Sequence, residues 1–263
     1  MEKLVVFSLI GVRPSMVKMI TRLPGENNNN YSYRAIKEGI LTLELLPGQL
    51  LSVGELTEAL KVSTTPIKSA LWKLQQEHLV DVIPQVGSYI SKINLDLVEE
   101  AASMWFDLEK EYLKSACKHF SEENIEQLKR NLSDQEMLFE QKHMLHNSKL
   151  VASKFSELDD KFHSIIFKGH QRNNTWKAIS QMATDYHRMI MLKGIESRIE
   201  HMIVEHKDIL SIIEKKEIER VENVLREHIF KPIDGWRQMG GMESHEGNVD
   251  DIFAYSNMGS LNF

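Results

Sequence analysis

The sequence predicts a mainly α-helical protein with an N-terminal winged helix-turn-helix and a C-terminal antiparallel all-α helical bundle. Three observations predict this fold class. Two short amphipathic segments follow a Pro-Gly turn, two short β-type runs come directly after them, and from Leu95 to about Lys231 the apolar residues recur at helical spacing. With 263 residues and 42% hydrophobic content, the chain is long enough for two ordinary domains.

The first two elements form a helix-turn-helix. Residues 46–49 read as a turn, and Ser52 stands where a hydroxyl caps a helix that stops near Val62. Ser63 then caps a second helix, which tolerates Pro66 in its first turn. One face of this second helix is apolar, with Ile67, Ala70, Leu71 and Leu74. The second helix of such a pair usually enters the major groove of DNA.

A β-hairpin follows the two helices. Residues 79–83 and 89–91 read as strands, and residues 84–87 form the turn between them. A helix-turn-helix followed by a hairpin is a winged helix.

At these residues the chain resembles the amino-terminal domain of the GntR family of bacterial transcription regulators, and residues 33–40 resemble that domain's first helix. The resemblance is carried by residues 46–48, 51–52, 56, 62–71, 74, 79–80 and 87. It implies binding to double-stranded DNA through basic, hydroxyl and amide side chains. The candidate contacts are Arg34, Ser63, Thr64, Thr65, Lys68, Lys73 and Gln85.

Several positions depart from the family pattern. Members commonly carry arginine where this chain has Thr64 and Lys68, glutamate where it has Val53, and basic residues in the wing where it has Gln85 and Val86. An arginine that grips guanine in a bidentate manner supplies about 1–3 kcal/mol of base discrimination, which lysine and threonine imitate poorly. We therefore expect either an operator of unusual sequence or weakened DNA binding.

Charge and composition divide the chain. The formal charge is −6, but residues 1–95 hold ten Lys/Arg against eight Asp/Glu, so the acidic excess lies in the second half. A single cysteine, Cys117, fits a cytoplasmic protein, and the apolar run at residues 4–12 is too short to span a membrane. The expected domains are a flexible extension (1–30), the winged helix (31–94), the helical domain (95–232) and a flexible tail (233–263).

The helical domain is divided by clusters of polar residues. Its expected helices lie near residues 96–118, 122–146, 150–168, 173–194, 197–214 and 217–231. Short connections imply that successive helices are antiparallel neighbours.

One carboxylate and three histidines in this domain are spaced to meet. Asp159 and His163 are four residues apart on one helical face. His206 and His228 lie before and after the turn at residues 215–216, so an antiparallel hairpin brings them within about one turn of the same level. Such a set suits zinc, or nickel, manganese or iron. On spacing alone, ordinary core or surface histidines remain the competing interpretation, because the chain has eleven.

The domain also resembles the FCD domain of the FadR subfamily, whose metal-binding members carry Asp-x-x-Phe-His on one helix and a histidine on each of the last two. Asp159, Phe162, His163, His206 and His228 match these positions. The resemblance implies a small carboxylate effector held by the ion and by an internal arginine, here Arg188. A second arginine common in relatives is replaced by Trp105, which favours a larger or less charged effector, or a purely structural metal.

Together these features predict a cytoplasmic, homodimeric transcription regulator that binds a pseudo-palindromic operator and a small-molecule effector, with activator and repressor both left open. A metal-binding sensor or structural module with weakened DNA binding is the alternative. A metal-dependent hydrolase is the distant competitor, but Asp160, the one adjacent candidate base, points about 100° away from Asp159 around the helix. We therefore predict that the protein is not an enzyme and acts away from membranes.

Overall fold

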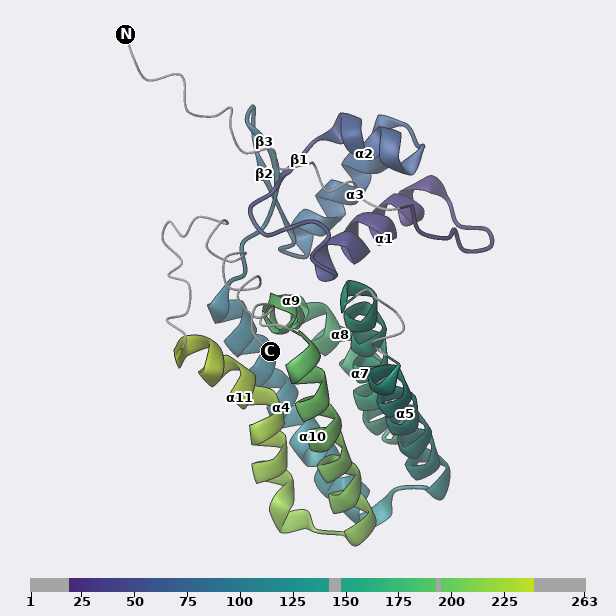
Figure 1. Cartoon of the computed structure of the whole chain (residues 1–263), viewed down its shortest axis with the longest axis vertical. Helices are drawn as coiled ribbons and strands as arrows, with labels where there is room; N and C mark the ends of the chain where they lie inside the picture. Colours follow the sequence, from purple (N-terminus) through teal and green to yellow (C-terminus); the bar gives the residue numbers. More distant parts are fainter. Residues whose placement is uncertain (1–18, 142–147, 193–194, 239–263) are drawn as a thin grey trace, which may run out of the picture. The chain divides into compact units, whose positions relative to one another are not determined.

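The computed structural model describes residues 19–141, 148–192 and 195–238, which form two compact units (Figure 1). Among these residues the first unit comprises 19–40 and 44–91, and the second comprises 41–43 and 92–238. Each unit has its own apolar core. The predicted fold class, a winged helix-turn-helix followed by an all-α bundle, is confirmed.

The first unit combines short helices with a small antiparallel sheet of order β1-β3-β2. Its elements are α1 (Asn28–Leu41), β1 (Leu50–Leu51), α2 (Val53–Leu60), α3 (Thr64–Gln76), β2 (Val80–Ile83) and β3 (Gly87–Ile90). In the wing, Val80 pairs with Ile90 and Ile83 with Gly87. Strand β1, which pairs Leu50 with Tyr89, was not predicted, because two residues are too short to show an alternating pattern.

The helix-turn-helix forms where the caps predicted it. Ser52 Oγ accepts a hydrogen bond of 3.3 Å from the Glu55 N–H at the start of α2. Lys61 caps the C-terminal end of α2, and its φ of 53° places it in the left-handed region. Ser63 occupies the N-cap position of α3, although its side chain makes no capping hydrogen bond. The predicted apolar face of α3 is buried, with Ile67, Ala70, Leu71 and Leu74.

Helix α1 begins earlier than expected. Asn27 Oδ1 accepts a 2.9 Å hydrogen bond from the Asn30 N–H, as a capping side chain does, and the helix starts at Asn28. The asparagine run expected to be flexible therefore forms the first turn of a helix. Residues 1–18 of the expected extension lie outside the described residues.

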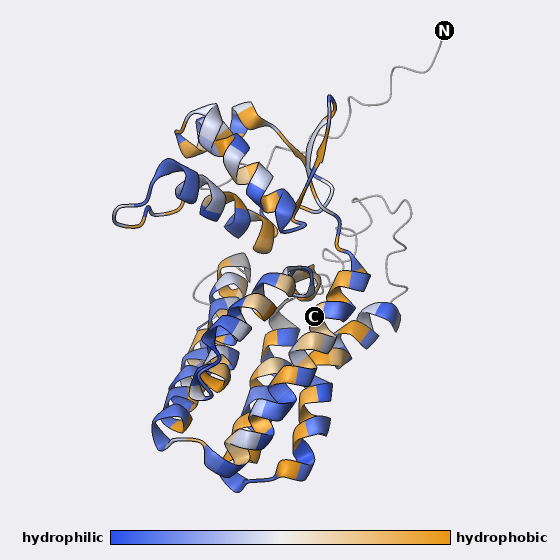
Figure 2. Ribbon diagram, turned by 180° about the vertical axis from the view of Figure 1, so that it is seen from behind, coloured by the Kyte–Doolittle hydropathy of each residue, from blue (hydrophilic) through white to orange (hydrophobic). Residues whose placement is uncertain are grey.

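The second unit is a helical bundle. Its elements are α4 (Leu95–His119), α5 (Glu122–Glu140), α7 (Ser148–Gly169), α8 (Asn173–Met182), α9 (Thr184–Leu192), α10 (Ile195–Lys215), the 3-10 helix η1 (Ile218–Arg220) and α11 (Val221–Gln238). Helix α4 packs against α7, α8, α9, α10 and α11 and is the central helix of the bundle. Figure 2 shows apolar residues recurring along these helices between polar ones. Within the described ranges, no helix is both long and apolar enough to cross a membrane.

Two helix boundaries in the bundle differ from expectation. The segment expected as one helix over 173–194 is divided at Ala183, whose ψ of 14° turns the backbone between α8 and α9. Helix α11 continues through Pro232 to Gln238, past the expected start of the tail, because Ile233 is buried in the bundle core and Trp236 packs against that core. The rest of the expected tail, residues 239–263, lies outside the described part of the chain.

Candidate metal centre and DNA-facing helix

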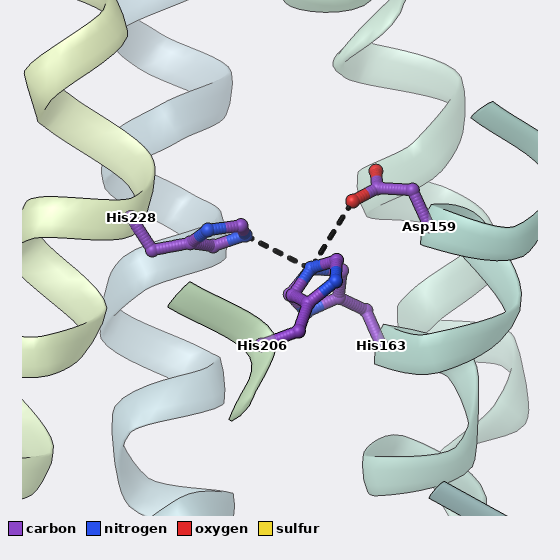
Figure 3. A group of neighbouring side chains, drawn as sticks. All are labelled: Asp159, His163, His206 and His228. Atoms are coloured by element: carbon purple, nitrogen blue, oxygen red, sulfur yellow. Dashed lines mark hydrogen bonds and ion pairs between the residues drawn. The ribbon is translucent and has the colours of Figure 1, made fainter. Parts of the chain in front are cut away.

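Four buried side chains meet inside the bundle (Figure 3). Asp159 and His163 come from α7, His206 from α10 and His228 from α11, and one potential ligand atom from each lies within 4.8 Å of the other three. His163 Nε2 is 3.1 Å from His228 Nε2, and Asp159 Oδ1 is 3.3 Å from His206 Nε2. Donors bound to one ion at roughly 2.0–2.2 Å are separated by about 3–4 Å. The spacing of these atoms therefore suits a single metal ion.

Each histidine of the cluster has an oxygen partner on its outer nitrogen. Glu109 Oε1 lies 2.7 Å from His163 Nδ1, and Glu205 Oε2 lies 2.9 Å from His228 Nδ1. These carboxylate oxygens accept hydrogen bonds, so both Nδ1 atoms carry the proton and donate it.

The third histidine follows the same pattern through an amide. Gln135 Nε2 donates to Asn131 Oδ1 at 2.7 Å, and Asn131 Nδ2 donates to the carbonyl of Leu158 at 3.0 Å. This chain of donors orients the Gln135 amide so that its oxygen faces His206 Nδ1 at 2.8 Å. All three imidazoles, when neutral, therefore direct an Nε2 lone pair into the cluster.

Two of the inner atoms lack hydrogen-bond partners. Asp159 Oδ1 and His206 Nε2 are buried without one in the protein. A buried polar atom without a partner costs about 1–3 kcal/mol, and lone pairs facing each other repel. A cation at the centre would satisfy both atoms together, so the donor set fits a divalent metal.

The electrostatics keep Asp159 and His206 unprotonated, as a cation requires, but favour a proton on His163. Burial raises the pKa of Asp159, but the adjacent imidazoles of His206, His163 and His228 outweigh burial and hold this pKa well below its usual range. Burial lowers the pKa of His206 to about 4, so its imidazole is neutral at pH 7. Burial also opposes the charged form of His163, but the adjacent Glu109 outweighs it and raises the pKa of His163.

The two candidate effector residues lie in different surroundings. Trp105 is buried, its ring packs edge-on against His163 with centroids 4.7 Å apart, and its Nε1 donates to Glu109 Oε2. Arg188 is fully buried, which excludes the solvated position that the sequence left open. Its guanidinium pairs with Asp185 at 2.6 Å and also reaches the Lys92 carbonyl at 3.4 Å.

Two candidate DNA contacts in the first unit are engaged within the protein. Arg34 forms a bidentate pair with Glu26, at 2.9 and 2.7 Å, and donates to the Thr21 carbonyl. The ammonium of Lys73 lies 3.7 Å from the centroid of the Tyr33 ring. Both cations would have to leave these partners, or share them, in order to bind phosphate.

The remaining candidates are exposed at one end of α3 and in the wing. Ser63, Thr64, Thr65 and Lys68 are exposed along the first turns of the helix. Gln85 is exposed in the hairpin turn with a φ of 63°. Hydroxyl groups and free N–H groups at a helix N-terminus are suited to bind phosphate oxygens.

Two family models match the chain. The model for bacterial regulatory proteins of the gntR family matches residues 32–90, and the FCD domain model matches residues 100–231. The two matches coincide with the winged helix and with the bundle that holds the cluster.

Similar whole proteins are transcription regulators. The HTH-type transcriptional repressor RspR of Escherichia coli K12 is 27% identical over 217 residues, which is 82% of this chain and 92% of that protein. A regulator from an unstable DNA locus of Streptomyces ambofaciens is 25% identical over 207 residues, 78% of this chain and 83% of that one.

Solved structures share the fold at low identity. E. coli McbR/YncC superposes with a TM-score of 0.64 at 16% identity, over 81% of this chain and 99% of that one. A GntR regulator from Rhodococcus sp. RHA1 gives a TM-score of 0.63 at 14% identity, over 81% and 97%.

Proposed function

The chain belongs to the GntR family of bacterial regulatory proteins and carries an FCD domain, so it is a DNA-binding transcription regulator, and we propose that a divalent metal in its bundle, together with a small acidic effector, controls operator binding. The matched families and relatives are regulators, not enzymes. The single observation that supports the metal is the inward convergence of three Nε2 atoms and one carboxylate, with every outer nitrogen already hydrogen-bonded.

Asp159, His163, His206 and His228 would hold the ion. Zinc is the first choice because nitrogen and oxygen donors in a set of four suit it, with nickel, manganese and iron as alternatives. When bound, the ion supplies a positive charge and a coordination position that a carboxylate can take.

The two effector candidates would act differently. Trp105 would contact the effector, because its ring packs directly against His163. Arg188 would act indirectly, because its charge is balanced by Asp185 and it holds the chain at Lys92, just before α4. A ligand that displaced this pairing would loosen the start of the bundle.

DNA binding would use the exposed residues of α3 and the wing, namely Ser63, Thr64, Thr65, Lys68 and Gln85, with Arg34 and Lys73 released from their internal partners. A homodimer acting in the cytoplasm would place two heads on a pseudo-palindromic operator. Because RspR is a repressor, we extend repression to this chain.

The metal is tested by elemental analysis of protein purified without chelators. We expect about one ion per chain, and a sharp loss in the His163→Ala/His206→Ala double variant. His119→Ala is the matched control, because His119 is exposed and outside the cluster. A wild-type protein without metal would overturn the proposal.

Control of DNA binding is tested on the sequence that the protein enriches from genomic DNA. Zinc and a panel of mono-, di- and tricarboxylic acids should change the affinity for that sequence. An unchanged affinity at saturation would remove the sensing role, and failure to enrich any fragment would favour the module with weakened DNA binding.

A further inference from the structure

Helix α3 presents an outward row that contains a tryptophan. Its inward face is buried, with Pro66, Ile67, Ala70, Leu71 and Leu74. On the opposite face Thr65, Lys68 and Trp72 follow each other at spacings of three and four residues, and all three are exposed. Residues seven apart differ by only about 20° around a helix, so Thr65 and Trp72 lie on one line.

The exposure of Trp72 is large. At 65% it exceeds that of every other exposed large apolar residue in the described ranges. A single exposed apolar residue is ordinary by itself, but the position of Trp72 is not. It follows Lys68 by one helical turn on the element that faces DNA in a helix-turn-helix, and α3 contains no acidic residue to repel phosphate.

The outward row of α3 differs in its chemistry from side chains that recognise bases through hydrogen bonds. Helix α3 contains no arginine, the side chain that forms two hydrogen bonds with guanine, and has Thr64 and Lys68 in its first turns. Indole offers one N–H donor and a broad apolar surface. In the major groove, the apolar group that a base pair presents is the 5-methyl group of thymine.

We propose that Trp72 is a specificity residue of the DNA site and packs its indole ring against a thymine methyl group in the major groove. This inference rests on the DNA-binding function given above. Lys68 then supplies charge to the same contact face, and Trp72 supplies sequence preference.

The test begins with the full-length, metal-loaded protein and a library of random DNA duplexes. The enriched site is resynthesised with uracil in place of thymine, one position at a time, which removes only the methyl group. We expect one position per half-site at which uracil weakens binding about fourfold, as for the loss of one buried methyl group.

Trp72→Ala should weaken binding to the enriched site about tenfold. The remaining binding of this variant should not change when uracil replaces thymine at the position that affects the wild type. Trp72→Phe should retain most of the wild-type affinity and its sensitivity to uracil. Because Trp72 is exposed, unfolding curves of both variants should match the wild type, which separates a binding defect from a folding defect.

Salt dependence separates Trp72 from its neighbour. Lys68→Ala should reduce the slope of log affinity against log salt by about one, whereas Trp72→Ala should leave the slope unchanged. Val204→Ala, at an exposed apolar residue in the other unit, is the matched control and should change neither affinity nor slope.

Three outcomes would overturn the inference. The first is an unchanged affinity of Trp72→Ala for the enriched site. The second is a loss of affinity in Trp72→Ala that is equally large on the thymine duplex and on every uracil-substituted duplex. The third is a change in the oligomeric state of Trp72→Ala without a change in DNA binding. Failure of the wild-type protein to enrich any sequence would instead overturn the DNA-binding function itself.

Discussion

At the residue scale, Glu109 is the buried carboxylate that connects the cluster to the surrounding core. It accepts from His163 Nδ1 through one oxygen and from Trp105 Nε1 through the other. Two donors offset part of the cost of burying its charge. The same contacts hold the imidazole in the tautomer and orientation that a metal needs.

Replacement of Glu109 by glutamine therefore weakens metal binding while all four ligands remain. The side-chain amide of this variant retains one acceptor oxygen, but its NH₂ group faces the N–H of either His163 or Trp105, so two donors oppose each other. We expect the Kd for zinc to rise about 10–100-fold in competition with a chromophoric chelator. Glu111→Gln is the matched control, since Glu111 is exposed and pairs only locally with Lys114. Equal affinities of the two variants would contradict the assigned role.

The sequence identified the four candidate ligands but not their partners. The spacing of four residues within one helix predicts that Asp159 and His163 lie together. His206 and His228 are predicted to join them because an antiparallel hairpin brings both histidines to nearly the same level. Glu109 and Gln135 lie 54 and 71 residues from the histidines they contact. Those contacts depend on how the helices are packed side by side, which spacing within one segment does not encode.

At the element scale, a buried ion pair fixes helix α9 against the start of α4. Asp185 Oδ1 accepts from Arg188, and Asp185 Oδ2 accepts from the Asn94 N–H at 2.9 Å. Arg188 also donates to the Lys92 carbonyl. The pair therefore holds the residues that lead into the central helix of the bundle.

Breaking this pair destabilises the bundle. Asp185→Asn leaves the Arg188 charge buried and unbalanced, which costs about 3–5 kcal/mol in urea unfolding. Asp185→Asn combined with Arg188→Met should cost less than the sum of the single changes, because the pair is coupled. Glu227→Gln, in an exposed pair with Lys231, is the control and should change stability by about 0.5 kcal/mol or less. Additive single effects would show that the pair does not act as a unit.

Elements with strong local signals were predicted well, and those that depend on packing were not. Ser52 and the apolar face of α3 located the helix-turn-helix directly. The division at Ala183 has no glycine or proline to announce it, and α11 passes through Pro232 because the residues beyond it are packed. Tertiary contacts thus decided the boundaries that local preference left open.

At the scale of the whole molecule, the candidate ligands join helices that are distant in sequence. One ion would tie together α7, α10 and α11, each of which also packs against the central helix α4. The unfolded chain has no such preformed site, so the free energy of metal binding adds to the stability of the fold. The metal would then be a structural element of the bundle as well as a sensor.

Metal removal should therefore lower the melting temperature of the bundle. At a free zinc concentration 100 times the Kd, binding contributes about 2.7 kcal/mol, which corresponds to roughly 5–10 °C for a domain of this size. Protons compete with zinc for the Nε2 atoms, and Glu109, which outweighs burial, raises the pKa of His163 and so favours its protonation as the pH falls. The zinc-dependent gain should thus be full near pH 7.5 and shrink toward pH 5. Calorimetry of zinc-loaded and chelator-treated protein across this range tests the expectation. A gain that is independent of pH, or that persists in the His163→Ala/His206→Ala variant, would place the zinc elsewhere in the chain.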